Sequence, residues 1–95
     1  MSVKTLQVTL TGSAQPISAS IIKCKWATFQ NNAAAVMRVG DANVTASRGY
    51  SLAISGGTFN VPVATASTFG TDLSQWYVIG TSTQLLDVVY DDMNF

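Results

Sequence analysis

The sequence predicts an all-β fold: a single-domain β-sandwich or jelly-roll-like small barrel of about seven or eight short strands. Apolar and polar residues alternate with a period of two along much of the chain, as they do on half-buried strands. Turn signals recur about every 8 to 12 residues. Helix signals are nearly absent, because the chain has no glutamate and its alanine run at residues 33–35 is too short to form a helix alone.

The N-terminal third is expected to hold strands separated by a turn at residues 12–16. Residues 5–11 alternate cleanly, and residues 17–21 do the same. At residues 21–22 the alternation shifts by one position, which implies a bulge or a change of sheet. Residues 22–26 continue the pattern with lysines on the opposite face. The residues expected to be buried here are Leu6, Val8, Leu10, Ile17, Ala19, Ile21, Ile22, Cys24 and Trp26.

The middle of the chain predicts three further strands. Residues 36–39 form a short one that ends in a turn at residues 40–43. Residues 50–55 form another, and the glycine pair at residues 56–57 predicts a tight turn, because glycine tolerates positive φ. In the strand that follows, Pro62 lacks an N–H donor, which places this strand at a sheet edge or makes it irregular.

The C-terminal third predicts two strands that lie in the middle of a sheet. Residues 65–72 are expected to form a loop, in which Asp72 caps a single helical turn. Residues 76–80 and 85–90 carry apolar side chains on both faces, which is typical of central strands covered on both sides. Residues 91–95 are either a free tail or an arm that reaches a neighbour. The whole chain, residues 1–95, is one domain.

The composition favours a surface that is partly covered by other chains. The chain is 47% hydrophobic and 11% charged, whereas roughly 25% charged residues are usual in soluble domains. The alternative is that abundant Ser, Thr, Asn and Gln solvate the surface well enough. A net charge of zero gives no general attraction to nucleic acid or to a membrane surface.

The charges are segregated along the chain. All the cations lie before residue 50, and four of the five carboxylates lie after residue 70. Two interpretations remain open: patches of opposite sign on neighbouring copies, or ion pairs across adjacent strands of one copy. The cations are Lys4, Lys23, Lys25, Arg38 and Arg48, and the late carboxylates are Asp72, Asp87, Asp91 and Asp92.

The single cysteine, Cys24, excludes an internal disulfide and is expected to be a small buried apolar residue. No basic start followed by a long apolar run predicts a signal peptide, and no apolar stretch approaches the length of a membrane span. We therefore expect a protein that is made and used on the cytosolic side.

Catalytic machinery is not expected, and neither is a metal or a cofactor. The chain has no histidine, which is the commonest general base and a favoured metal ligand. Asp87 with Asp91, or Asp91 with Asp92, is the best carboxylate pair for hydrolysis, but neighbouring carboxylates at a chain end favour solvation over catalysis. Asp41 and Asn43 are too few oxygen ligands for calcium and are ordinary turn residues.

Two aromatic patterns bear on binding. Lys23, Lys25 and Trp26 form a small basic-aromatic group, but alternation puts the lysines on one face and the tryptophan on the other, which argues against nucleic-acid binding. Trp76 and Tyr77 point to opposite faces of one strand. One of the two is expected in the core, and the other is exposed or in contact with a partner.

Residues 26–90 resemble small virion proteins of tailed bacteriophages. The resemblance lies in the order of several short phrases, the most specific being Asp-Leu-Ser-Gln-Trp-Tyr-Val-Ile-Gly-Thr at residues 72–81. Phe-Gln-Asn at residues 29–31, Val-x-Arg-Val-Gly-Asp at 36–41, Gly-Gly at 56–57, Val-Pro at 61–62 and Leu-Asp-Val-Val-Tyr at 86–90 complete it. The chain departs from the pattern at residues 54–55, where a proline commonly precedes the glycines. The resemblance implies a β-sandwich or jelly-roll-like module and transfers no catalytic residue.

The expected function is therefore that of a structural virion protein and not an enzyme. The leading hypothesis is a capsid decoration or cement protein that bridges subunits of the major capsid protein, made in the host bacterial cytoplasm and located in the virion. The alternatives are a tail, collar or fibre component, and a carbohydrate-binding β-sandwich that uses Trp26, Trp76 or Tyr77 as a stacking platform. Self-association as a dimer or trimer is expected.

Overall fold

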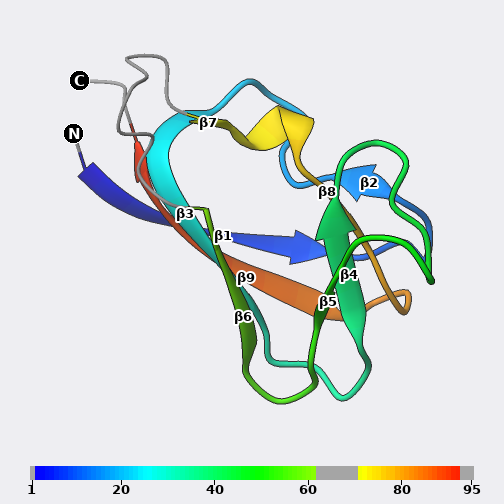
Figure 1. Ribbon diagram of the computed structural model, residues 1–95. Coiled ribbons are helices and arrows are strands. Elements are labelled where there is room, and N and C mark those ends of the chain that lie inside the picture. Colours follow the sequence, from blue (N-terminus) through cyan, green and yellow to red (C-terminus); the bar gives the residue numbers. More distant parts are fainter. Residues whose placement is uncertain (1, 62–70, 93–95) are drawn as a thin grey trace.

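The computed structural model describes residues 2–61 and 71–92, which form strands and one short 3₁₀ helix (Figure 1). The all-β prediction is confirmed. The elements are β1 (Ser2–Thr9), β2 (Gln15–Pro16), β3 (Lys23–Asn31), β4 (Met37–Gly40), β5 (Tyr50–Leu52), β6 (Gly57–Val61), β7 (Thr71–Asp72), η1 (Leu73–Gln75), β8 (Tyr77–Ile79) and β9 (Leu85–Asp92). The described residues contain no helix long and apolar enough to span a membrane.

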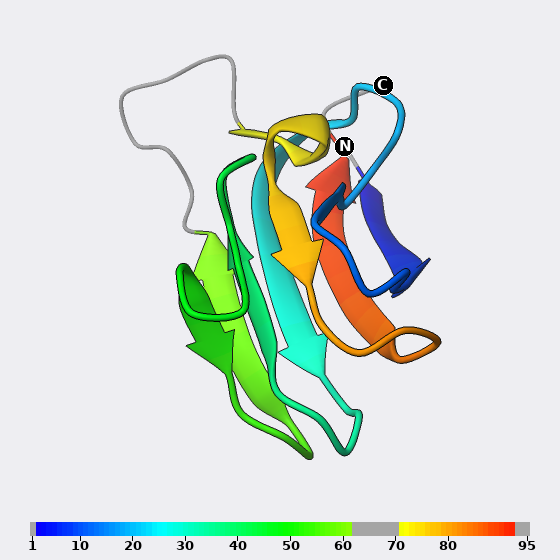
Figure 2. The ribbon, with the colours of Figure 1, turned by 90° about the vertical axis from the view of Figure 1, so that its right-hand side faces the viewer.

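The strands form two antiparallel sheets that pack face to face. The larger sheet has the order β1-β9-β3-β6, and β7 adds to one end of β3. The smaller sheet has the order β2-β8-β4-β5. Figure 2 shows the long strands of the larger sheet side by side, with β1 outermost. The sequence prediction that β8 and β9 are central strands is confirmed.

The order of the strands is that of a jelly roll. When β7 is set aside, the first strand pairs with the last and the pairing proceeds inward: β1 with β9, β2 with β8, β3 with β6, and β4 with β5. This is one long antiparallel hairpin wrapped around a barrel axis, which is how a jelly roll of eight strands arises. Contacts of β3 with β9 and of β4 with β8 then complete the two sheets.

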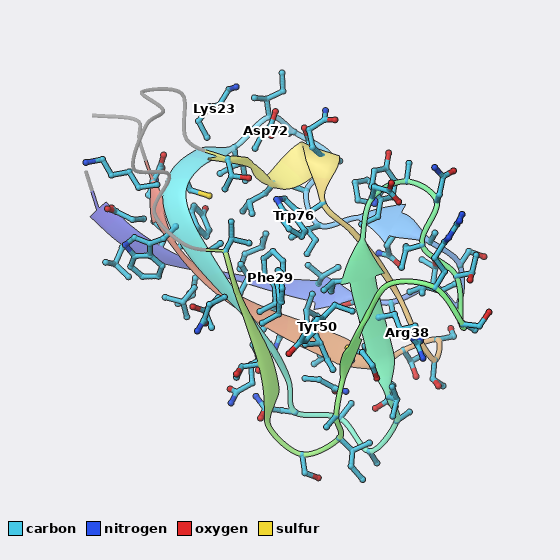
Figure 3. All side chains as sticks on the ribbon, viewed as in Figure 1. Lys23, Phe29, Arg38, Tyr50, Asp72 and Trp76 are labelled. Atoms are coloured by element: carbon cyan, nitrogen blue, oxygen red, sulfur yellow. The ribbon has the colours of Figure 1, made fainter. Side chains whose placement is uncertain are left out.

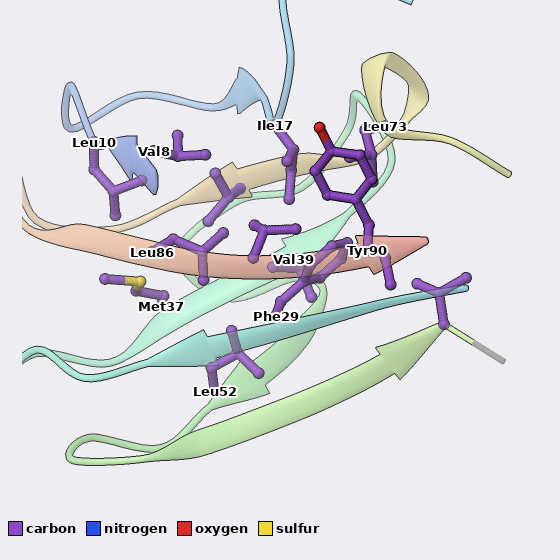
Figure 4. Packing of buried hydrophobic residues seen from close by; sticks show 14 of the residues in the cluster. Val8, Leu10, Ile17, Phe29, Met37, Val39, Leu52, Leu73, Leu86 and Tyr90 are labelled. Atoms are coloured by element: carbon purple, nitrogen blue, oxygen red, sulfur yellow. The ribbon is translucent and has the colours of Figure 1, made fainter. Parts of the chain in front are cut away.

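The core lies between the two sheets and is built from alternate residues of their strands. Phe29 is fully buried near its centre (Figure 4). Its ring centroid lies 5.7 Å from that of Trp76 and 6.1 Å from that of Phe59. Burying one such side chain contributes about 1.5–3 kcal/mol. The other buried residues of this core cluster are Val8, Leu10, Ile17, Cys24, Ala27, Met37, Val39, Leu52, Val61, Leu73, Val78, Leu86, Val88 and Tyr90.

Several local predictions are confirmed. Asp72 caps η1, because its Oδ1 accepts from the backbone N–H of Ser74 at 2.9 Å. The turn between β5 and β6 uses positive φ at Ser55 and Gly56. β6 is an edge strand, as the proline after it predicts. Pro62 itself and the other residues of the expected loop up to residue 70 lie outside the described part of the chain.

The strand predicted at residues 17–21 is wrong. Ile17 is buried, but the chain bends immediately after it, and Ile21 is 72% exposed. The reason is a local hydrogen-bonded turn: the Ser18 hydroxyl donates to the carbonyl of Ser20 at 2.7 Å and accepts from its N–H at 3.1 Å. Serine side chains that bond to the backbone in this way compete with strand pairing.

The predicted register shift exists, but it lies a few residues later than expected. Cys24 is opposite Asp92 and Ala27 is opposite Tyr90, so β3 has one more residue than β9 in this interval. This bulge removes Trp26 from the buried face of Cys24 and leaves its side chain half-buried. The sequence carries a signal at this position, because Trp26 and Ala27 are consecutive apolar residues between two alternating segments.

The C-terminal strand differs from expectation in two ways. β9 extends beyond Tyr90 to include Asp91 and Asp92, and residues 93–95 lie outside the described residues. Its outer face is also open, since Leu85 and Val89 are 39% and 37% exposed. A single two-layer sandwich covers only one face of each sheet, so the apolar residues on the second face of β9 have no layer to cover them.

Candidate functional site

Three of the four late carboxylates are engaged in structural contacts: Asp72, Asp87 and Asp92. Asp92 is buried at the end of β9, and its Oδ2 lies 2.8 Å from the Nζ of Lys4. This corrects the expectation that Asp92 is solvated, and it supports ion pairing within one copy. The ion pair with Asp92 raises the pKa of Lys4. The paired strands β1 and β9 bring the two residues together although they are distant in sequence.

Asp72 is also held by its neighbours. Burial alone would raise its pKa, but hydrogen bonds from Ser74 and from the N–H of Ile22, with the charge of Lys23, together lower it. Lys23 lies opposite Asp72 in the pairing of β3 with β7 (Figure 3). This carboxylate therefore joins β3, β7 and η1 at one end of the sandwich.

Asp87 and Asp91 do not form a catalytic pair. They lie four residues apart on the same face of β9, which corresponds to about 13 Å along a strand. Asp87 instead accepts hydrogen bonds from the side chains of Gln7 at 3.0 Å and Asn32 at 2.7 Å. Asp91 and Asp92 are consecutive strand residues and point to opposite faces. The described residues contain no group of three His, Cys, Asp or Glu side chains placed to hold a metal ion.

The turn residues Asp41 and Asn43 act as the sequence indicates. The Oδ1 of Asp41 accepts from the backbone N–H of Asn43 at 3.0 Å, which closes an ordinary Asx turn. Cys24 is fully buried, and this burial raises the pKa of its thiol to about 11. Neither feature presents a reactive group.

The aromatic residues divide between core and rim. Trp76 is half-buried, packs against Phe29 and Phe59, and donates its indole N–H to the hydroxyl of Thr71 at 2.9 Å. Trp76 is therefore the core member of the Trp-Tyr pair, and Tyr77 is half-buried on the outer face of β8. Lys23 and Lys25 are both exposed next to the half-buried Trp26.

The strongest candidate for an interaction surface is a group of exposed apolar residues in two neighbouring loops at one end of the small sheet. The loop after β3 and the turn after β5 lie side by side at this end in both ribbon views, and the N–H of Ser55 donates to the carbonyl of Ala33 at 3.1 Å (Figures 1 and 2). These loops expose Val36 at 52% and Ile54 at 50%. The exposed alanines 34 and 53 lie beside them in the chain.

The same region continues onto the outer face of the small sheet. Val36 also lines a shallow depression of about 290 Å³, whose apolar floor includes Ile79 and Ala46. We call the set Ala34, Val36, Ala46, Ala53, Ile54 and Ile79 the apolar surface. Arg38 is the charged residue that lines the depression, and its Nη1 donates to the carbonyl of Gly49 at 2.9 Å. The depression has no carboxylate in its lining.

Sequence reasoning did not identify the apolar surface. The sequence predicts Val36 and Ile54 as strand residues, because each lies in or next to an alternating segment. In the structure both lie in loops, and Met37 and Leu52 provide the buried strand positions. The available signal was the absence of charge in both loops, which becomes informative only when the fold places the loops side by side.

Comparisons with known proteins do not add a relative. No protein-family model, no curated protein and no solved structure matches this chain.

Proposed function

We propose that this chain is a capsid decoration protein of a tailed bacteriophage, which stabilises the shell by bridging subunits of the major capsid protein. The observation that carries the proposal is the apolar surface, on which Val36 and Ile54 are each about half exposed and Ala46 and Ile79 line the depression beside Val36. Exposed apolar side chains that gather in one part of a small domain are typical of protein contacts. The jelly-roll order and the likeness of residues 72–81 to virion proteins supply the class of partner.

Covering such a surface removes apolar area from water, and each Å² contributes about 25 cal/mol. Val36 and Ile54 are each about half exposed, so covering the rest of each side chain adds roughly 0.7–1.5 kcal/mol to binding. The centres of protein interfaces are depleted of charge, as this surface is. Arg38 at its border would pair with an acidic residue of the shell and fix the orientation. A jelly roll alone does not specify function, because lectins and other proteins share it.

The direct test is mass spectrometry of purified phage particles. The proposal expects the chain in hundreds of copies for each particle. A dozen copies or fewer would indicate a tail, collar or fibre component instead. Complete absence of the chain from purified particles would overturn both virion roles.

A matched pair of variants tests the apolar surface itself. Ile54→Ser removes an exposed side chain in the proposed interface and touches little of the core. We expect it to weaken binding to empty capsid shells by about 3-fold to 10-fold, because only half of the side chain remains to be covered. Ile21→Ser is the control, because Ile21 is even more exposed but lies in the 17–22 segment, away from the apolar surface. Equal binding by the two variants would exclude this surface as the docking site.

A second candidate function is carbohydrate binding. One edge of Trp76 lines an open depression of about 290 Å³ together with Gly40, Asp41 and Gln75. An aromatic wall beside a carboxylate and an amide is a chemistry that suits sugar hydroxyls. A glycan array with the protein and with Gln75→Ala would test it, and specific binding lost in the variant would favour this function.

A further inference from the structure

The outer edge of β1 is a long strand edge that no other described strand pairs with. β1 has eight residues, each paired in register with β9, and no other described strand pairs with its opposite side. The edge strands of the small sheet are only two and three residues long. An exposed edge of regular geometry is a template for another strand.

The hydrogen bonds at the end of β1 show which residues face this edge. The N–H of Leu10 donates to the carbonyl of Gln84, and the carbonyl of Leu10 accepts from the N–H of Thr83, both at 2.9 Å. Leu10 therefore points its peptide groups toward β9. Because this direction alternates along a strand, the even-numbered residues of β1 bond to β9 and the odd-numbered residues point outward.

The far end of the edge is already occupied by a side chain of this chain. The Nε2 of Gln15 donates to the carbonyl of Thr9 at 3.0 Å, and its Oε1 accepts from the N–H of Thr11 at 2.8 Å. The amide of Gln15 thus takes the place of a neighbouring strand at residues 9–11. The outward peptide groups of Val3, Thr5 and Gln7 are left without such a cover in the described structure.

We propose that β1 pairs antiparallel with β1 of a second copy across a two-fold axis at Thr5. In this register Thr5 lies opposite Thr5 of the second copy, Val3 lies opposite its Gln7, and Gln7 lies opposite its Val3. Each of these three pairs exchanges two backbone hydrogen bonds. Moving the axis to Leu6 would require the carbonyl of Thr9, which Gln15 already occupies.

The charges and side chains of the edge suit this partner. Lys4 is the charged residue of β1, and Asp92 of the same copy neutralises it, so two edges approach without net repulsion. Val3 is 64% exposed in the single chain, and the aliphatic stem of Gln7 from the second copy would cover it. The half-buried Leu6 would lie opposite Lys4 of the second copy, whose aliphatic stem covers it. Opposed threonines are a favourable cross-strand pair.

The contact is small, so the dimer is expected to be concentration-dependent. An interface below about 1,200 Å² is typical of transient association. Sedimentation of the purified protein between roughly 10 µM and 1 mM, where transient contacts dissociate, should show a shift from monomer to dimer. Such a dimer forms without any shell protein, so its failure and that of the proposed function are distinguishable. A wild-type protein that stays monomeric throughout this range would overturn the proposal.

Charge-swap variants at Thr5 test the register. Thr5→Asp and Thr5→Lys each place like charges opposite one another on the axis, so each alone should be monomeric. An equal mixture places opposite charges together and should restore a heterodimer, seen by native mass spectrometry. The control mixture is Thr58→Asp with Thr58→Lys, because Thr58 is exposed on the distant strand β6 and its substitution should leave the wild-type dimer unchanged. Dimers in each single Thr5 variant, or a mixture that stays monomeric, would overturn the two-fold register.

A backbone variant gives a second, independent readout. The N–H of Thr5 points outward, so Thr5→Pro removes no hydrogen bond to β9 and is tolerated on an edge strand. We expect it to abolish the dimer at 1 mM while the monomer keeps its circular dichroism spectrum. If Thr5→Pro fails to fold, amide hydrogen exchange of the wild-type protein decides: the amide of Thr5 should exchange more slowly as concentration rises. An exchange rate that is independent of concentration would contradict the pairing.

Discussion

Replacing Asn31 by alanine should be among the most destabilising single changes in this fold. Asn31 is the last residue of β3 and is fully buried. Its Nδ2 donates to the carbonyls of Ala35 at 2.8 Å and Leu52 at 3.1 Å, and its Oδ1 accepts from the N–H of Ala33 at 2.8 Å. One side chain therefore ties the loop after β3 to β5 and holds the base of the apolar surface.

The expected loss of stability follows from these three hydrogen bonds. Each contributes about 0.5–1.5 kcal/mol, and a buried carbonyl left without a partner costs about 1–3 kcal/mol. We expect Asn31→Ala to lower the free energy of unfolding by about 3–4 kcal/mol. A domain of this size has roughly 5–14 kcal/mol in total. The melting temperature should therefore fall by roughly 12–30 °C.

The assay is urea unfolding followed by circular dichroism, with Asn60→Ala as the matched control. Asn60 is exposed on β6 and accepts one hydrogen bond, from the hydroxyl of Thr28 at 2.9 Å. Its replacement should cost about 0.5 kcal/mol or less. If Asn31→Ala costs less than about 1 kcal/mol, or no more than the control, the bonds of Asn31 do not hold this end of the sandwich.

Three further predictions concern single residues. Asp72→Ala should lower the free energy of unfolding by about 1 kcal/mol at pH 7, because the cap is lost. The folded pKa of Asp72 is lowered, so its contribution to stability is present above about pH 4 and is lost as the pH falls through the folded pKa. Urea titrations below pH 4 should therefore show a shrinking difference in stability between variant and wild type, and a constant difference would contradict this role. Cys24, with its pKa near 11, should react with a thiol reagent at pH 8 only after unfolding, since roughly one thiol in a thousand is ionised there; rapid labelling of the folded protein would disprove its burial. Gly57→Ala should destabilise the protein by more than about 2 kcal/mol, because a Cβ would lie 2.5 Å from the carbonyl oxygen of Ala53. Thermal melts measure this loss, and an unchanged melting temperature would mean that the turn adapts.

Local features of the fold were predictable because short-range chemistry specifies them. The alternation around Leu6 and Val8 marks a strand with one buried face, whatever that strand pairs with. The Asp-x-Ser sequence beginning at Asp72 specifies its own cap through a bond across two residues. The turn at Gly56 needs positive φ, and the glycine itself indicates this in the sequence.

The jelly-roll order was beyond the reach of local patterns. It depends on pairings between strands that are far apart in sequence, such as Thr5 with Val89. Several sandwich topologies satisfy the same alternation, so the sequence predicted a class of folds and not one order of strands. Ile17, Ala19 and Ile21 illustrate the opposite failure, in which a convincing alternation is overridden by a serine turn.

The candidate surfaces were less predictable than the fold. Low charge predicts a surface that other chains cover but does not locate it, and Val36 and Ile54 lie in neighbouring loops only because the β3–β4 and β5–β6 loops meet. Likewise, the occupied end of the β1 edge depends on where Gln15 returns after the turn. Two consecutive asparagines at residues 31–32 are typical of a turn, and only the closure of the fold buries Asn31.

A map of the assembled phage particle would test the decoration role directly. We expect density for a small two-layer jelly roll repeated over the outside of the shell, with the loops at Val36 and Ile54 facing the capsid surface. A map in which the shell carries no such density, from particles shown to be complete and infectious, would contradict it.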